Sequence, residues 1–393
     1  MKILNIKKGR KSRRFDKKKL MKLVLTIGII ILAISACMYI GNKNVRDFMN
    51  KYILKKDVTE NDLAIIPINL EGNKNIYSYY KYITTLENNI LSNYTSSGKK
   101  ESEVKLDINN PMYESNNQFL IVAEKDGNKI ALVSGEKIFW EKEIEGNISK
   151  IHVNRNGYSA ISVTGTTYKT VIIVFDQNGK ELFKTYLSNT LVVDLDIAND
   201  NKSLAFMELN TTGTVVQSYV KIISIEKAKK SPSDAIEYTY TAETDELIIN
   251  IKYQDKNKLF MICNNGIKLL EEETVEKVVD FSNKSIKFSD IELNNHYYQI
   301  VEETTSLLKT ESTVKFKNVV SEKESVYILS GTVKKVYSYG EIIAVNLGSE
   351  VYFINTNGWL VKKYTSTQEV QKIVICNNLA GIVYRDKIEL INL

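Results

Sequence analysis

The sequence predicts an all-β fold, a β-propeller of about seven blades, preceded by a single N-terminal transmembrane helix. Three observations lead to this prediction. From residue 104 onward, β-branched and aromatic residues alternate with polar ones, in short runs that end at Asn, Asp or Gly turns. A strand–turn–strand phrase recurs through the same region, and a run of eighteen residues without a charge lies near the N-terminus. Only 3 of the 393 residues are Pro, which fits a chain made of sheet ladders.

The recurring phrase is an alternating strand, a turn of Asn, Asp or Gly, and a second apolar strand. It begins near Val104, Lys150, Val192, Ile248, Ile286, Val333 and Val370. Seven phrases between residues 104 and 393 give about 41 residues each, close to the roughly 40–50 residues of a four-stranded propeller blade. The phrase spacing therefore predicts a propeller.

Two of the phrases align in detail. Residues 156–184 and 339–363 each read as three strands joined by two tight turns. The steps Asn178-Gly179 and Asn357-Gly358 fall at the same place in the alignment. Glycine supplies the positive φ that short hairpins need, so both steps are expected in turns.

The last phrase has room for only three strands, so the ring needs a strand from earlier in the chain. Strands are expected over 62–70 and 76–83, and we expect this N-terminal part, 62–103, to close the ring and remove the exposed edges of an open array. Residues 92–103 are rich in Ser, Asn, Gly and Lys without periodicity, and are expected to be a loop or flexible linker.

The net charge of +6 is concentrated at the N-terminus. Residues 1–22 hold eleven basic residues and one acid, Asp16, for a local charge of +10, and the rest of the chain carries −4. This excludes a globally basic nucleic-acid-binding body, so no nucleic-acid partner is expected.

Residues 23–40, LVLTIGIIILAISACMYI, are uncharged and would extend about 27 Å as a helix. We predict that this segment is an uncleaved signal-anchor spanning the lipid bilayer. The positive-inside rule then places residues 1–22 in the cytoplasm and the C-terminal domain outside the cell. A helical stalk is expected over 41–61, followed by an extracytoplasmic propeller over 62–393.

Two other interpretations of the same segment stay open. Ile34-Ser35-Ala36-Cys37 resembles a lipobox, in which Cys37 would become the lipidated N-terminus and anchor the chain. The small residues Ala33, Ser35 and Ala36 are also compatible with a cleaved secretory signal. The long basic segment and the apolar residues after Cys37 favour the membrane helix.

The phrases resemble those of irregular WD40-like and quinoprotein-like propellers, without the repeated Gly-His and Trp-Asp signature. The whole arrangement resembles an uncharacterised clostridial (Firmicutes) family of membrane-anchored proteins with an extracytoplasmic propeller of unknown function. The basic N-terminus, the single apolar span and the Lys-, Asn- and Ile-rich body carry this resemblance, which covers nearly the full chain. It implies a membrane-anchored propeller and no particular activity.

The paired carboxylates Asp194 and Asp196 lie on one face of a predicted strand, as an acid/base pair for glycoside cleavage would, and Asp200 follows. Propeller strands also place such acids in the central channel or in turns. His152 alternates within a predicted strand and His296 lies in a predicted turn, and neither has a motif partner. We therefore expect structural or solvated side chains rather than catalytic ones.

The remaining polar and reactive residues are assigned to structure in the same way. Asp176-Gln177-Asn178-Gly179-Lys180 lacks the further acids of a calcium loop and is predicted to be a hairpin turn, and Glu271-Glu272-Glu273 is predicted to be solvated. Cys263 and Cys376 end apolar runs and are predicted to be buried free thiols. With 2 His and 3 Cys the chain has no zinc-ligand spacing and no disulfide framework.

Trp140 and Trp359 are predicted to cover blade faces, with a channel-mouth aromatic that stacks a sugar or peptide as the alternative. The sequence assigns no catalytic residue, cofactor or metal. We therefore expect a membrane-anchored binding or scaffold module at the bacterial cell envelope that holds a protein, peptide or glycan. The alternative is an envelope hydrolase or lyase with acids such as Asp194 and Asp196 in the propeller funnel.

Overall fold

The computed structural model describes residues 63–68, 75–255, 257–306 and 309–393, together with residues 21, 25–28, 33–34, 36–39, 41 and 49. The chain divides into two units, Met1–Val58 and Thr59–Leu393. In the first unit, residues 25–28, 33–34 and 36–39 are helical. The described residues include no helix with the length and apolar character needed to cross a membrane. The predicted tail (1–22) and stalk (41–61) lie almost entirely outside the described residues, and so do eight residues of the predicted span (23–40).

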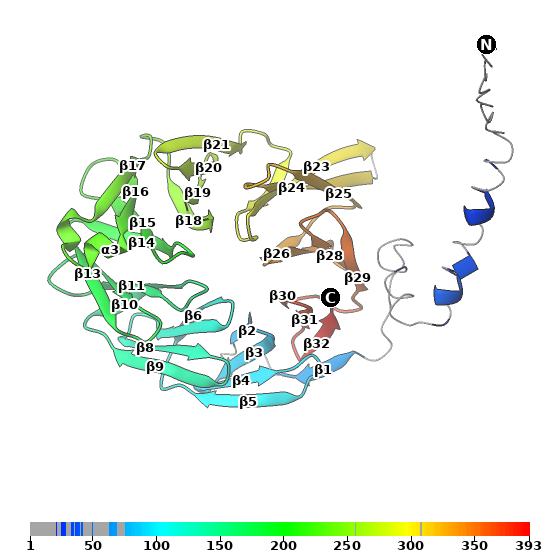
Figure 1. Ribbon diagram of the computed structural model, residues 1–393, viewed down its shortest axis with the longest axis horizontal. Helices are drawn as coiled ribbons and strands as arrows, with labels where there is room; N and C mark the ends of the chain where they lie inside the picture. The colour runs from blue at the N-terminus through cyan, green and yellow to red at the C-terminus, as the bar shows by residue number, and fades with distance from the viewer. Residues whose placement is uncertain are drawn as a thin grey trace, which may run out of the picture. The chain divides into compact units, whose positions relative to one another are not determined.

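The second unit is an all-β propeller of eight four-stranded antiparallel sheets, arranged as a ring (Figure 1). We number these blades 1 to 8 along the chain and letter the strands of each blade a to d, from the centre of the ring outward. Blade 1 is β2 (Asn75–Tyr79), β3 (Tyr82–Glu87), β4 (Ile90–Tyr94) and β5 (Lys100–Lys105). Blade 2 is β6 (Pro111–Asn116), β7 (Phe119–Glu124), β8 (Lys129–Ser134) and β9 (Lys137–Glu143). Blade 3 is β10 (Asn147–Val153), β11 (Ser159–Thr164), β12 (Thr170–Phe175) and β13 (Glu181–Leu187). Blade 4 is β14 (Thr190–Ile197), β15 (Ser203–Asn210), β16 (Gln217–Ser224) and β17 (Ile236–Thr241).

The second half of the ring follows the same plan. Blade 5 is β18 (Ile248–Asp255), β19 (Lys258–Cys263), β20 (Gly266–Glu271) and β21 (Thr274–Asp280). Blade 6 is β22 (Ile286–Asp290), β23 (His296–Ser306), β24 (Lys309–Asn318) and β25 (Glu324–Ser330). Blade 7 is β26 (Lys335–Tyr339), β27 (Ile342–Asn346), β28 (Glu350–Asn355) and β29 (Leu360–Thr365). Blade 8 is β30 (Lys372–Cys376), β31 (Leu379–Val383), β32 (Lys387–Asn392) and, outermost, β1 (Ala64–Pro67).

Because neighbouring strands are antiparallel, the connections lie at the two ends of the ring axis. The a–b and c–d turns lie at one end, which we call the a–b face. The b–c turns and the connections between blades lie at the other end, the b–c face. The c–d connection of blade 4 carries the short helix α3 (Ile225–Ala228) and the 3-10 turn η2 (Pro232–Asp234).

The hydrophobic core is divided among the blade interfaces. Each pair of neighbouring blades shares one cluster of buried apolar side chains, and the eight clusters together follow the ring. This arrangement explains the short apolar runs of strands such as β7 and β12, because alternate side chains of a strand face the preceding and the following blade and both faces are buried. The cluster between blades 8 and 1 joins both ends of the unit, since it unites Ile66 of β1 with Ile83 of β3 and Ile388 of β32.

The last blade is completed by the first strand. β1 pairs antiparallel with β32, from Ala64 opposite Leu390 to Pro67 opposite Lys387. Pro67 is tolerated because β1 is an edge strand and needs no further donor on its outer side. Pairing the first strand with the last three fixes the two ends of the ring to each other and leaves no open blade.

The predicted number of about seven blades is wrong, because the propeller has eight. The phrase at Val104 lies on β5, the d strand of blade 1, and not on the a strand of blade 2. Blade 1 was missed because 92–103 was expected to be a loop, whereas β4 and β5 occupy most of it. The d strand β5 is polar because it lies on the outside of the ring, where Lys100, Glu101 and Glu103 face solvent.

The alignment of 156–184 with 339–363 is confirmed as β11–β13 and β27–β29. The c–d turns of the two blades are equivalent in detail. The Asp176 carboxylate accepts hydrogen bonds from the backbone N–H groups of Asn178 and Lys180, both at 2.9 Å. The Asn355 side chain accepts from Asn357 and Trp359, both at 3.1 Å, and Gly179 and Gly358 have φ of 77° and 74°. Residues 176–180 therefore form a hairpin turn.

Closure by β1 can be tested with two neighbouring isoleucines that point in opposite directions. Ile66 is 1% exposed and Ile65 is 50% exposed on the same strand. We expect Ile66→Ala to lower the free energy of unfolding by about 2–4 kcal/mol, because it leaves a cavity in the cluster that joins blades 8 and 1. Ile65→Ala should change it by less than about 0.5 kcal/mol. Urea unfolding measures both, and equal small effects would show that β1 does not hold the ring closed.

Candidate functional site

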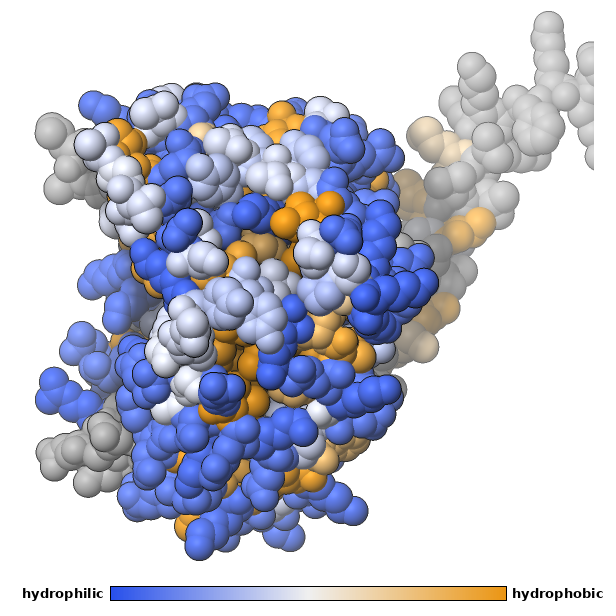
Figure 2. Space-filling view, turned by 90° about the vertical axis from the view of Figure 1, so that its left-hand side faces the viewer, coloured by the Kyte–Doolittle hydropathy of each residue, from blue (hydrophilic) through white to orange (hydrophobic). Residues whose placement is uncertain are grey.

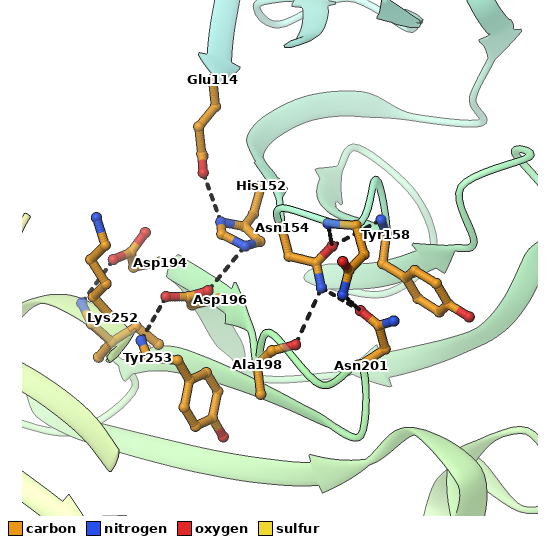
Figure 3. Close-up of polar contacts among 12 residues, drawn as sticks. Glu114, His152, Asn154, Tyr158, Asp194, Asp196, Ala198, Asn201, Lys252 and Tyr253 are labelled. Carbon is orange, nitrogen blue, oxygen red and sulfur yellow. Dashed lines mark hydrogen bonds and ion pairs between the residues drawn. The ribbon is translucent and has the colours of Figure 1, made fainter. Parts of the chain in front are cut away.

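The a strands of blades 2 to 6, or the residues beside them, bring charged side chains together along the wall of the central channel, and Figure 3 shows residues of blades 2 to 5 in this wall. A β-bulge early in four consecutive a strands sets the register of these side chains. After each bulge, polar side chains at alternate positions face the next blade. The bulges lie at Ile148/Lys150, Val192/Asp194, Ile248/Asn250 and Ile286/Phe288.

The two aspartates predicted as a pair both bind the backbone of the next blade. The Asp194 carboxylate accepts a hydrogen bond from the N–H of Ile251 at 2.9 Å, and Asp196 accepts from the N–H of Tyr253 at 2.8 Å. Both donors belong to β18, an a strand with no strand partner on its inner side. The side chains are only 4% and 7% exposed, so each carboxylate supplies an acceptor that water cannot readily supply.

Two cations of blade 3 balance these carboxylates. Lys150 Nζ lies 2.9 Å from Asp194 Oδ1, and His152 Nε2 lies 3.0 Å from Asp196 Oδ1. The other ring nitrogen of His152, Nδ1, lies 2.7 Å from Glu114 Oε1 of blade 2. Figure 3 shows the imidazole between the two carboxylates.

The His152 imidazole is held in its charged form. Burial by itself would lower the pKa of His152, but the adjacent Glu114 and Asp196 carboxylates outweigh it and raise the pKa well above its ordinary value of 6.5. At neutral pH both ring nitrogens therefore carry protons. A doubly protonated imidazole between two carboxylates ties three blades together and has no lone pair with which to act as a general base.

The charged wall continues into blades 5 and 6. Lys252 Nζ forms an ion pair with the Glu292 carboxylate, which lowers the pKa of Glu292. Asp290 accepts a hydrogen bond from Ser338 Oγ of blade 7 at 3.3 Å. Burial, with a smaller contribution from Glu292, raises the pKa of Asp290 to about 6. Asp290 therefore takes up a proton in mildly acidic solution more readily than an ordinary aspartate does.

The interfaces between blades 7 and 8, 8 and 1, and 1 and 2 also have polar contacts between a strands or between residues beside them. The Tyr337 hydroxyl lies 3.5 Å from the carbonyl oxygen of Gln371, and Lys372 Nζ lies 2.7 Å from that of Ile76. Ser115 Oγ donates to the carbonyl of Ser78 at 3.1 Å. Every blade interface therefore has at least one such contact near the channel.

The structure brings together three of the residues singled out from sequence, Asp194, Asp196 and His152. Asp200 lies apart from them, in the a–b turn of blade 4, where its carboxylate accepts from the N–H of Lys202 at 3.0 Å. His296 lies in blade 6, with Nδ1 2.6 Å from the carbonyl of Asn294. The two histidines thus belong to different sites.

Cys263, Cys376 and the two tryptophans lie within the blades or in their turns. Cys263 and Cys376 are buried free thiols, and burial raises the pKa of each to about 12, so neither is a reactive thiolate. Trp140 is buried between blades 2 and 3 and its ring centroid lies 5.6 Å from that of Phe175. Trp359 lies in the c–d turn of blade 7 and is 59% exposed. Within the described ranges, no group of three or more His, Cys, Asp or Glu side chains is arranged to hold a metal ion.

Sequence reasoning missed Glu114, Lys150, Lys252 and Glu292, although a signal for Lys252 exists. When the a strands are aligned on their bulges, His152, Asp196, Lys252 and Asp290 take the same position. Charges at one position of successive repeats indicate side chains that meet around the axis. A bulge-corrected alignment of the phrases would have shown this.

The family model for DUF5711, a family of unknown function, matches residues 61–393, which include all eight blades. The chain belongs to this family. A search of the curated proteins finds no match.

The propeller is also similar to solved structures. BamB from Moraxella catarrhalis is 12% identical, with 84% of this chain and 97% of that chain covered and a TM-score of 0.46. Raptor from Chaetomium thermophilum is 9% identical, with 89% and 30% covered and a TM-score of 0.46. AztD from Citrobacter koseri is 10% identical, with 77% and 88% covered and a TM-score of 0.45. Likenesses this low transfer no function or partner.

The charge of His152 predicts a specific pH dependence of stability. A histidine whose pKa is raised by folding contributes its full stability below the unfolded pKa of about 6.5, and loses it as the pH rises through the folded pKa. The NMR titration of this two-histidine chain should show His152 titrating well above 6.5. His152→Gln should lower the free energy of unfolding by about 2–4 kcal/mol at neutral pH, because Glu114 and Asp196 lose their cation, and should remove the decline on the alkaline side.

His296→Gln is the matched control, because it removes the other imidazole and leaves the channel intact. It should keep the pH dependence of the parent chain. An unchanged pH dependence in His152→Gln, or titration of His152 at or below 6.5, would contradict a charged histidine in the channel.

Proposed function

We propose that this chain is a membrane-anchored, extracytoplasmic binding or scaffold module of the bacterial cell envelope. The observation that carries the proposal is a cluster of exposed apolar side chains on the b–c face of blades 3 to 5. Of the seventeen large apolar side chains exposed in the described part of the propeller, eight gather there. They are Tyr168, Tyr186, Leu191, Val193, Val215, Val216, Leu247 and Ile249.

Three contacts join the loops and strand ends that carry these side chains. The rings of Tyr168 and Tyr186 lie 4.7 Å apart, centroid to centroid. Lys169 Nζ lies 3.3 Å from Thr211 Oγ1, which joins the b–c loops of blades 3 and 4. The N–H of Ile248 donates to Ser218 Oγ at 3.4 Å, which joins blades 4 and 5. Exposed apolar side chains gathered in neighbouring loops are typical of a site that binds another molecule.

The rest of the propeller contrasts with this surface. In the described channel wall, the ionisable side chains bind backbone groups or one another. Asp194 and Asp196 accept hydrogen bonds from the backbone of β18 and form ion pairs with Lys150 and His152 of blade 3. Figure 2 shows the outer side of the ring around blades 3 and 4, where hydrophilic residues prevail and apolar spots are small and separate. Binding at a face therefore fits the structure better than chemistry in the channel.

The membrane anchor rests on the sequence. The apolar run 23–40 follows the basic segment 1–22, and that order supports an N-terminus in the cytoplasm and a propeller outside the cell. The resemblance to clostridial membrane-anchored proteins points the same way. Lipidation of Cys37 would anchor the propeller to the same side of the membrane. A tethered apolar surface suits a protein, peptide or glycan partner of the envelope.

Crosslinking on intact cells tests both parts of the proposal. A membrane-impermeant crosslinker should capture a partner with the parent chain, because the propeller lies outside the membrane. Tyr186→Ser/Val215→Ser should lose most of that partner, since truncation of central aromatic contacts costs about 2 kcal/mol or more of binding free energy, a factor of about 30. Mass spectrometry of the captured proteins or glycans gives the measurement.

Val320→Ser/Ile328→Ser is the control, because these side chains are as exposed but lie in blade 6, at the a–b face and on the outer strand. It should keep the partner. Failure of the parent chain to crosslink from outside, or equal loss in both variants, would refute the proposed module.

A further inference from the structure

Lys372 differs from the other cations that meet around the channel, because it has no carboxylate partner. It is the first residue of β30, the a strand of blade 8, and it is half-buried. Lys150, His152 and Lys252 are each paired with a carboxylate. In the part of the chain that the structure describes, no carboxylate lies within ion-pair distance of Lys372. Burial, which no counter-charge opposes, lowers the pKa of Lys372 from its ordinary value of 10.5.

The ammonium group of Lys372 reaches across blade 1 to blade 2. Its Nζ donates to the carbonyl oxygen of Ile76 at 2.7 Å and to the hydroxyl oxygen of Tyr113 at 3.4 Å. Ile76 lies on β2 and Tyr113 on β6, the a strands of the next two blades around the channel (Figure 1). An ammonium group has three N–H donors, and two of them are used here. One N–H therefore has no partner among the described residues and is left for a ligand.

The hydroxyl of Tyr113 supplies a second donor beside the first. Its oxygen accepts from Lys372, and its own proton has no acceptor in the described ranges. Burial raises the pKa of Tyr113, so the hydroxyl keeps this proton at neutral pH. The ring of Tyr113 stacks on that of Tyr77, with the centroids 4.0 Å apart, and Tyr77 is buried, which fixes the position of the hydroxyl. Two donors this close together can bind the two oxygens of one carboxylate.

The groups around the two donors are uncharged. Tyr77 and Tyr113 come from blades 1 and 2. On the side of blade 7, the hydroxyl of Tyr337 lies 3.5 Å from the carbonyl oxygen of Gln371, the residue before Lys372. A single cation in these surroundings matches the one negative charge of a carboxylate better than the larger charge of a phosphate. Such a ligand would also offset the cost of a half-buried ammonium group without a counter-ion.

We propose that Lys372 and Tyr113 bind the carboxylate group of a ligand in the central channel, with one oxygen accepting from the ammonium and the other from the hydroxyl. The carboxylate belongs to a free small acid or to the C-terminus of a peptide, which share this chemistry. The inference goes beyond the proposed function, because it concerns the channel beside blades 8, 1 and 2. It needs neither the membrane anchor nor the apolar side chains of blades 3 to 5.

Saturation-transfer difference NMR on the purified full-length chain tests the site, because this method detects weak binding of small ligands to a large protein. The probes are acetate and Nα-acetyl-alanine, which carry a carboxylate, and acetamide is the uncharged blank. We expect a saturable signal from acetate that acetamide lacks and that an equal concentration of chloride does not remove. A signal from acetate alone identifies a free small acid, and signals from both probes identify a peptide C-terminus as well.

Two variants assign the binding to the two donors. Lys372→Met should weaken acetate binding about thirtyfold, because it removes both the charge and a hydrogen bond. Tyr113→Phe should weaken it about tenfold, because it removes the O–H donor to a charged ligand and keeps the stacked ring. Tyr113→Phe decides the test by itself if Lys372→Met fails to fold.

Lys335→Met is the matched control. Lys335 is the first residue of β26, the five-residue a strand of blade 7, as Lys372 is the first residue of the five-residue β30, but Lys335 is exposed. The control should leave the dissociation constant of acetate unchanged within about twofold. Absence of a signal from both carboxylates, an equal signal from acetamide, full displacement by chloride, unchanged binding in Tyr113→Phe, or an equal loss in Lys335→Met would overturn the proposal. Because the anchor and the apolar side chains are untouched, each of these results leaves the proposed function standing.

Discussion

The backbone of the innermost strands sets the constraint on which the propeller depends. Each a strand pairs with a sheet neighbour on one side only, so the N–H and C=O groups on its other side point into a narrow channel and need partners. Asp194 and Asp196 meet this need for Ile251 and Tyr253. Burying two carboxylates is costly unless they are paired, which explains why Lys150 and His152 lie against them and why Glu114 lies against His152. The charged side chains of the channel wall are thus explained by the unpaired backbone edge of the a strands.

The same constraint assigns roles to the parts of the molecule. Carboxylates that hold backbone N–H groups and cations are not free for acid/base chemistry, which supports the proposed binding at a face of the ring. Tyr253 joins the channel to the a–b face, because its backbone is held by Asp196 while its side chain lies at the a–b end of blades 4 and 5. The apolar surface lies at the opposite end, where loops vary in length between blades.

Much of the fold could be predicted from the sequence, because short apolar runs between Asn, Asp and Gly turns indicate strands that are buried on both faces, as in a blade between two others. Blade 1 was not predicted because its outer strand β5 is polar, and the sequence of a polar outer strand resembles that of a linker. The strand that completes blade 8 was expected from an earlier part of the chain, but its pairing partner depends on contacts more than 300 residues apart, Ile66 with Ile388 among them. At the site, the sequence pointed to Asp194, Asp196 and His152 but not to their shared role. That role depends on the β-bulges in four of the a strands, each of which shifts the register by one residue and which no local pattern marks.

Hydrogen exchange at the amides of Ile251 and Tyr253 tests the central claim most directly, because these N–H groups face the channel from an edge strand and are protected only if the carboxylates bind them. The account predicts that both amides exchange as slowly as amides within the sheet ladders. In Asp194→Ala, the amide of Ile251 should lose its protection while that of Tyr253, held by Asp196, keeps it. Exchange of both amides at the rate of a solvent-exposed edge in the parent chain would contradict the account.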